Sequence, residues 1–235
     1  MLGSARGLVF DLGGTLVDTL DDLWLALNSA LREHGHRPVE RAVVLASVHA
    51  GLNGTARAAL RDQVGTEHGL AALQSSYLQH YRRREHAASR PYAGVREYLD
   101  DCRQRCIPMV ICTNKSSEEG RDLLLTLGLA GHFVGVIGLD TCGTAKPDPA
   151  PLRRALALLG VTAEHAAFVG DSEFDSLCAS RGGVRFVLHE HGYGRDAALR
   201  HPCAGRFRRY ADLMPAACPP EVSSPHRPPD GATQA

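Results

Sequence analysis

Short apolar runs, each bounded by glycine or turn residues, recur along the sequence. They lie at residues 8–10, 107–112, 133–139, 166–169 and 184–188. Their length and composition are typical of buried strands. Between them, apolar residues recur with helical spacing at 95–102, 123–127 and 152–159. Strands that alternate with helices predict an α/β fold with a Rossmann-like parallel sheet, covered by helices on both faces.

A long insertion separates the first apolar run from the second. It contains no convincing strand, and one amphipathic helical face is formed by Leu20, Leu23, Trp24, Leu27 and Leu31. Weaker helical stretches follow at 43–48, 56–60 and 70–81. We therefore predict an α-helical cap domain at 18–90, inserted into a core domain made of 1–17 and 91–214.

The last segment, 215–235, has a different composition from the rest of the chain. It is rich in Pro, Ser and Gly and shows no periodicity. Such a segment buries too little apolar surface to offset its ordering entropy. We expect a disordered tail.

Charge and cysteine usage exclude several classes of protein. Lys+Arg and Asp+Glu both number 26, so composition shows no basic excess of the kind expected of a nucleic-acid binder. The seven cysteines form no CxxC pair and are expected to be reduced. We find neither a signal peptide in the first ten residues nor an apolar run as long as a membrane span, and so predict a cytoplasmic location without a membrane partner.

Polar clusters follow four of the predicted strands. They are Asp11-Leu12-Gly13-Gly14-Thr15, Thr113-Asn114-Lys115, Lys146-Pro147-Asp148, and the segment from Gly170 to Asp175. Ligands of open parallel sheets bind beyond the carboxyl ends of the strands. All four clusters are therefore expected to converge at one edge of the sheet.

The residue types in these clusters favour phosphate chemistry with magnesium. Carboxylates at Asp11, Asp171 and Asp175 suit a hard cation, while Lys146, Thr113 and backbone amides suit phosphate oxygens. The clusters offer no thiolate or imidazole, which favours Mg²⁺ over zinc. A carboxylate beside a bound phosphate can attack phosphorus and form an aspartyl phosphate.

At 7–194 the sequence resembles the haloacid dehalogenase-like hydrolase superfamily, and within it the phosphoglycolate phosphatase group. The motifs that carry this resemblance occur in order: VFDLGGTLVDT, ICTNK, the lysine of AKPDP, and VGDSEFD. The segment from Arg90 to Val95 marks the return from the cap. Four ordered motifs together are far more specific than any one of them.

The resemblance implies a role for each matching residue. Asp11 would be the nucleophile and a metal ligand, and the backbone carbonyl of Gly13 and Asp171 would be further ligands. Asp175 would support the metal shell or Lys146. Thr113, Asn114 and Lys146 would bind the substrate phosphate, with Lys146 also part of the catalytic set. Lys115 is interpreted instead as a surface or helix-start residue.

Gly13 departs from the family pattern. Phosphatases of the family carry Asp two residues after the nucleophile, where it protonates the leaving oxygen and then activates water. Glycine can do neither, and a positioned acid or base contributes about 10²–10⁴ in rate. We expect retained Mg²⁺ and phosphate binding with slower turnover. A cap histidine, His34, His36 or His49, or a group of the substrate is a candidate substitute.

Two other groups of the superfamily also lack that Asp, but this sequence matches them less well. Phosphonatases use a cap lysine, whereas the only lysines here are Lys115 and Lys146, outside the cap. Dehalogenases do not depend on the metal ligands, which are intact here. We predict a magnesium-dependent phosphatase for small phosphate monoesters such as 2-phosphoglycolate, acting as a monomer or homodimer. The alternatives left open are an impaired homologue that binds a phosphometabolite as a regulator, and a phosphotransferase.

Overall fold

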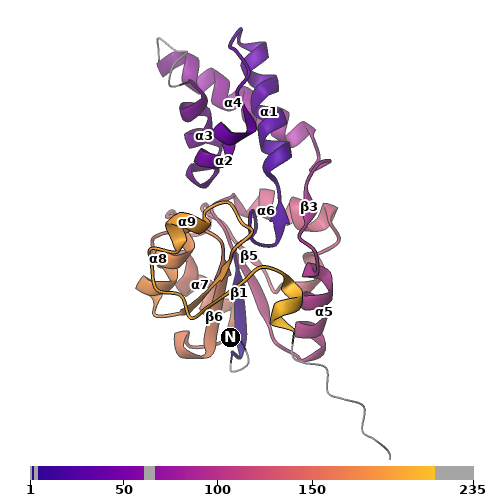
Figure 1. Ribbon diagram of the computed structural model, residues 1–235, viewed down its shortest axis with the longest axis vertical. Helices are drawn as coiled ribbons and strands as arrows, with labels where there is room; N and C mark the ends of the chain where they lie inside the picture. Colours follow the sequence, from indigo (N-terminus) through magenta and orange to yellow (C-terminus); the bar gives the residue numbers. More distant parts are fainter. Residues whose placement is uncertain (1, 3–4, 61–66, 215–235) are drawn as a thin grey trace, which may run out of the picture.

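The core is a parallel sheet of six strands in the order β5-β4-β1-β6-β7-β8 (Figure 1). The computed structural model describes residue 2 and residues 5–60 and 67–214. The strands are β1 (Gly7–Phe10), β4 (Met109–Cys112), β5 (Val136–Ile137), β6 (Ala166–Gly170), β7 (Arg185–His189) and β8 (Gly205–Phe207). Every neighbouring pair in this sheet is parallel. The predicted α/β, Rossmann-like fold class is confirmed.

Helices cover both faces of the sheet because successive strand residues point to opposite sides. Leu8 and Phe10 of β1 pack on the face covered by α5 (Val95–Gln104) and α6 (Ser117–Thr126). Val9 packs on the opposite face, under α7 (Ala150–Leu159) and α8 (Glu173–Gly182). The short helix α9 (Arg195–Ala198) follows β7. Continuous apolar runs are thus explained by burial on both faces.

Two strands differ from the sequence prediction. β8 is missed because only Phe207 of its three residues is buried, which leaves no apolar run. β5 is shorter than the predicted 133–139. The chain turns after Gly138, where the Thr141 amide donates to the Gly138 carbonyl at 3.0 Å. A Cβ on Gly138 would lie 2.3 Å from the Ser117 nitrogen, so only glycine fits there.

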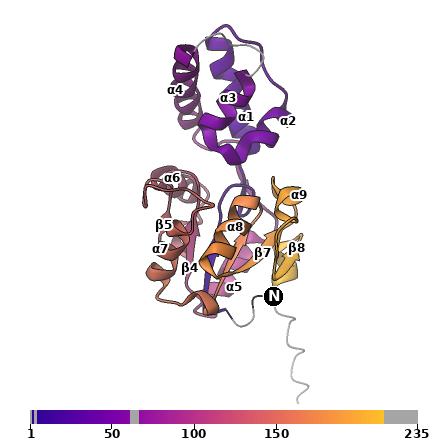
Figure 2. The same cartoon turned by 90° about the vertical axis from the view of Figure 1, so that its left-hand side faces the viewer.

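Four helices form a separate apolar cluster beyond the carboxyl ends of the core strands (Figure 2). They are α1 (Leu20–Glu33), α2 (Arg41–Ser47), α3 (Gly51–Leu60) and α4 (Glu67–Arg83). The buried leucine face of α1 packs with Tyr77 and Tyr81 of α4. The chain crosses between cap and core at β2 (Val17–Asp18) and β3 (Arg90–Pro91), which pair antiparallel. The domain limits at 18 and 90 stay predictions, and the predicted tail lies outside the described residues.

Within the described part of the chain, we find no helix with the length and apolar character needed to cross a membrane.

Asp22 of α1 ties the cap to the segment that returns to the core. Its fully buried carboxylate accepts hydrogen bonds from Arg84 Nε at 2.6 Å, the Ala88 amide at 3.0 Å and Ser89 Oγ at 2.7 Å. Burial alone would raise the pKa of Asp22, but these donors outweigh it and hold the pKa below its ordinary value. A group with a depressed folded-state pKa stabilises the fold above its unfolded pKa.

Replacing Asp22 with asparagine is expected to lower the free energy of unfolding at neutral pH by about 1.5–3 kcal/mol, the usual contribution of charged hydrogen bonds. The difference from wild type should shrink as the pH falls through the folded-state pKa, because the wild-type carboxylate then becomes protonated too. Urea unfolding at several pH values measures this. The matched control is Asp21→Asn, since the Asp21–Arg41 pair is about half exposed and should contribute less than about 1 kcal/mol. Equal losses for both variants would contradict the account.

Candidate active site

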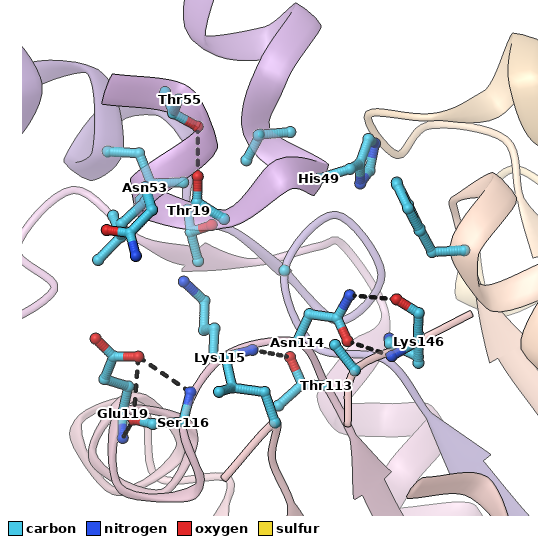
Figure 3. Close-up of a pocket in the computed structure, with 18 of the residues that line it drawn as sticks. Thr19, His49, Asn53, Thr55, Thr113, Asn114, Lys115, Ser116, Glu119 and Lys146 are labelled. Carbon is cyan, nitrogen blue, oxygen red and sulfur yellow. Dashed lines mark hydrogen bonds between the residues drawn. The ribbon is translucent and has the colours of Figure 1, made fainter. Parts of the chain in front are cut away.

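The carboxyl ends of β1, β4 and β6 meet beneath a cavity of about 600 Å³ that lies between core and cap (Figure 3). Asp11 follows β1, Thr113 and Asn114 follow β4, and Lys146 precedes α7. These four residues and Gly13 line the cavity. Asp171 and Asp175, which follow β6, are fully buried close by. The structure thus brings together all the residues that the sequence assigned to the site.

The Lys146 ammonium donates hydrogen bonds to three other residues of the site. Its Nζ donates to Asp11 Oδ1 at 2.7 Å, to Asp175 Oδ1 at 2.6 Å and to the Cys112 carbonyl at 2.9 Å. Burial alone would favour the neutral amine, but the two carboxylates outweigh it, and the pKa of Lys146 is raised. The lysine is therefore a charged ammonium that fixes the Asp11 carboxylate at the cavity wall.

Asp175 has a structural role as well as a place in the charged cluster. Its Oδ2 accepts hydrogen bonds from Ser172 Oγ at 2.6 Å and from the Ser172 amide at 3.0 Å, and Ser172 Oγ caps α8 in return. Its other oxygen, Oδ1, holds Lys146. Asp175 thus links the start of α8 to the lysine, and its predicted part in the metal shell stays a prediction.

Asp171 is held by the loops around it. Thr15 Oγ1 donates to its Oδ1 at 2.9 Å, and the Tyr193 amide donates to its Oδ2 at 2.7 Å. Gly14 has a φ of +89°, and a Cβ there would lie 2.5 Å from Asp171 Oδ2. Only glycine combines this backbone conformation with such a close approach.

The acidic cluster has an uncompensated charge that fits a divalent cation. One oxygen from each of Asp11, Asp171 and Asp175 lies within 4.8 Å of the others, and one ammonium, Lys146, is paired with the group. Burial and the neighbouring carboxylates raise the pKa of Asp171 well above its ordinary value, and burial also raises that of Asp11 against the opposing effect of Lys146. Clustered, buried carboxylate oxygens are the donor set that Mg²⁺ prefers.

Thr113 and Asn114 lie at the cavity wall in different ways. Thr113 is buried, and its Oγ1 accepts from the Lys115 amide at 3.3 Å. The Asn114 side chain bonds the Lys146 backbone through both polar atoms, at 2.8 and 3.0 Å. In this arrangement Asn114 positions the segment that carries Lys146, and the predicted phosphate contacts of both residues stay predictions.

Sequence reasoning missed several residues that line the cavity, among them Thr19, Lys115 and Tyr193. Lys115 directly precedes Ser116, the N-cap of α6, which agrees with the predicted helix-start position. It is not a surface residue, because it is partly buried and its Nζ lies 3.2 Å from the Tyr81 hydroxyl. Tyr193 lies in the loop after β7, so inspection of a fifth strand end would have found it. It accepts from the Thr19 amide at 2.7 Å and donates to Asp18 at 2.6 Å.

Among the three cap histidines weighed as substitutes for the missing acid, His49 lines the cavity. Its Nε2 is buried without a hydrogen-bond partner in the described part of the chain, and burial lowers its pKa. His34 and His36 follow the C-terminal end of α1, about 20 Å along the helix from the end that faces the cavity.

The comparisons with known proteins agree with the chemistry that the residues of this site suggest. Residues 8–189 match the family model described as haloacid dehalogenase-like hydrolase. The chain belongs to this family. A phosphoglycolate phosphatase of Rhodospirillum rubrum is 36% identical over 88% of this chain and 89% of its own length. One from Cereibacter sphaeroides is 34% identical over 88% and 95%, respectively.

The fold of this haloacid dehalogenase-like hydrolase also matches solved structures. A predicted phosphoglycolate phosphatase from Haemophilus somnus superposes with a TM-score of 0.84, covering 91% of this chain and 98% of that chain at 24% identity. The resemblance inferred from the four motifs is confirmed. The enzyme class that they indicate, a phosphoric monoester hydrolase, agrees with the family and with these relatives.

Proposed function

We propose that the protein is a magnesium-dependent phosphatase of small phosphate monoesters, with 2-phosphoglycolate as the first substrate to test. The observation that carries the proposal is the Asp11–Lys146–Asp175 cluster at the base of the cavity, with Asp171 beside it. The names of the curated relatives support the choice of substrate. A cytoplasmic location stays a prediction.

In the proposed reaction, Asp11 attacks the phosphorus of the ester. Its carboxylate faces the cavity and is held by Lys146 at 2.7 Å, so little reorganisation precedes attack. A bond forms between an Asp11 oxygen and phosphorus, and the bond between phosphorus and the ester oxygen breaks. Water then attacks the aspartyl phosphate, releasing phosphate and restoring the carboxylate.

Asp11, Asp171 and the Gly13 carbonyl would hold the Mg²⁺ ion, with Asp175 supporting that shell or Lys146. Bound there, the ion supplies positive charge to the phosphate oxygens. Lys146 would contribute a second positive charge at the phosphate, and Thr113 and Asn114 would add hydrogen bonds. The excess of buried carboxylates over the single ammonium supports this assignment.

Because residue 13 is glycine, the carboxyl group that would protonate the leaving oxygen of the ester is missing at that position. We therefore expect slow release of alkoxides, whose oxygen needs a proton, and faster release of phenolates, which leave without one. His49 is positioned at the cavity as a candidate substitute.

Phosphate release from a panel of esters tests the proposal. The panel contains 2-phosphoglycolate, sugar phosphates, nucleotides and 4-nitrophenyl phosphate, each assayed with Mg²⁺ and with EDTA. We expect multiple turnovers with Mg²⁺, loss of activity with EDTA, and higher rates on the aryl ester than on alkyl esters. Equal rates with and without Mg²⁺, or no release from any ester, would contradict it.

A further inference from the structure

The loop between β7 and α9, residues 190–194, packs directly against Asp171. The Tyr193 amide donates to Asp171 Oδ2 at 2.7 Å. A Cβ on Gly192 would lie 2.5 Å from the same carboxylate oxygen, so a residue with a side chain does not fit there. Because the contact is this close, a shift of the loop also shifts a hydrogen bond that orients the Asp171 carboxylate.

The hydroxyl of Tyr193 reaches the point where the chain enters the cap. It accepts a hydrogen bond from the Thr19 amide at 2.7 Å and donates one to Asp18 Oδ1 at 2.6 Å. Asp18 ends β2, Thr19 directly precedes α1, and Asp18 Oδ1 also accepts from the amide of Leu20, the first residue of α1. The Tyr193 side chain is therefore bonded to the segment that sets the position of the first cap helix.

The cap itself contacts the same loop through His49, between α2 and α3. The centre of the His49 ring lies 6.3 Å from that of Tyr193 and 6.2 Å from that of Phe174. A Cβ on Gly194 would lie 2.7 Å from His49 Nε2, so this contact also requires glycine in the loop. The loop thus touches the cap at a second place, far along the sequence from Thr19.

We propose that Tyr193 is a positioning residue for the metal site, which couples the orientation of Asp171 to the position of the cap. The inference rests on the proposed function, because Asp171 is a ligand of Mg²⁺ there. One residue makes both connections, with its amide at Asp171 and its hydroxyl at the cap entry, and the aromatic ring between them is rigid. Groups that hydrogen-bond to a metal-ligating carboxylate orient it and tune the affinity for the metal. Mg²⁺ affinity therefore depends on a contact with the cap entry.

Calorimetric titration with Mg²⁺, without any ester, tests the coupling independently of turnover. Tyr193→Phe removes only the hydroxyl, and leaves the ring beside His49 and the amide at Asp171. Asp18→Ala removes the carboxylate partner of that hydroxyl from the other side. Tyr77→Phe is the matched control, because the Tyr77 hydroxyl is buried within the cap and has no hydrogen-bond partner among the described residues. Urea unfolding in EDTA measures the stability of each variant separately from metal binding.

We expect Tyr193→Phe to raise the dissociation constant of Mg²⁺ by about tenfold, as is usual when a group that supports a metal ligand is changed. Asp18→Ala should raise it as well, and Tyr77→Phe should leave it unchanged. The double variant Asp18→Ala/Tyr193→Phe should show less than the product of the two single effects, because both changes remove the same hydrogen bond. A role confined to stability would change unfolding in EDTA but not the dissociation constant.

A folded Tyr193→Phe variant that binds Mg²⁺ as tightly as wild type would overturn the inference and leave the proposed phosphatase standing. If Tyr193→Phe does not fold, unchanged Mg²⁺ affinity of Asp18→Ala would overturn it equally. The expected pattern of dissociation constants without phosphate release from any ester would contradict the proposed function alone. Absence of Mg²⁺ binding by wild type would contradict both.

Discussion

Replacing Gly13 with aspartate is expected to raise the rate of phosphate release from alkyl phosphates by about 10²–10⁴, the contribution of a positioned acid or base. The backbone of Gly13 is not in the left-handed region, so the substitution needs no backbone change. Thr19 Oγ1, which has no hydrogen-bond partner among the described residues, lies where it can donate to the new carboxylate. The gain should be smaller for 4-nitrophenyl phosphate, because nitrophenolate leaves without protonation and the new carboxyl group then speeds only the attack of water on the aspartyl phosphate. Steady-state kinetics with Mg²⁺ on both esters measure the effect.

Gly13→Asn is the matched control, because asparagine has nearly the same size and can hydrogen-bond to Thr19 but cannot act as the acid or base. We expect it to show no gain on either ester. If Gly13→Asp also shows none, or if wild type already turns over alkyl and aryl esters at similar high rates, the missing carboxyl group does not limit this enzyme.

Replacing Lys146 with methionine is expected to produce the largest loss of stability. The change removes the ammonium that neutralises buried Asp11 and Asp175, at 2.7 and 2.6 Å. Removing one partner of a buried ion pair costs about 3–5 kcal/mol. Phosphate release should also fall by at least about 10²-fold, because a preorganised positive charge at the phosphate is lost. Guanidinium unfolding and steady-state kinetics measure the two effects.

Lys115→Met is the control for this variant. It removes the only other lysine, from the same cavity, without leaving a buried carboxylate unpaired. Its loss of stability should be well below that of Lys146→Met. Comparable losses would show that the Lys146 ion pairs do not dominate the local energetics.

The convergence of the candidate site residues could be predicted from the sequence because parallel strands end at one edge of a sheet. Asp11, Thr113, Lys146 and Asp171 follow short apolar runs, so the fold class alone placed them together. The directions in which the side chains point could not be predicted in this way. Lys115 is adjacent to Asn114 in the same motif, yet only the structure shows that its ammonium lies beneath the cap at Tyr81.

Contacts between segments that are distant in the sequence also could not be predicted. Thr19 belongs to the first motif, but the position of its hydroxyl, which has no partner in the described part of the chain, depends on the path of the chain into α1 and on Tyr193, far along the sequence. The choice among the cap histidines depended on helix packing, which places His49 at the cavity. β8 escaped prediction because three residues with one buried side chain carry too little periodicity.

The most direct test of the central claim is the detection of a phosphoryl group on Asp11. Because Gly13 cannot activate water, hydrolysis of the aspartyl phosphate should be slow. Formation of the aspartyl phosphate from an aryl ester should be fast, because the phenolate leaves without a proton. Rapid mixing with 4-nitrophenyl phosphate and Mg²⁺ should give a burst of about one nitrophenolate per chain. Mass spectrometry of the quenched protein should place the phosphoryl group on Asp11, and Asp11→Asn should show neither. Turnover by Asp11→Asn at the wild-type rate, or a phosphoryl group on another residue, would contradict the account.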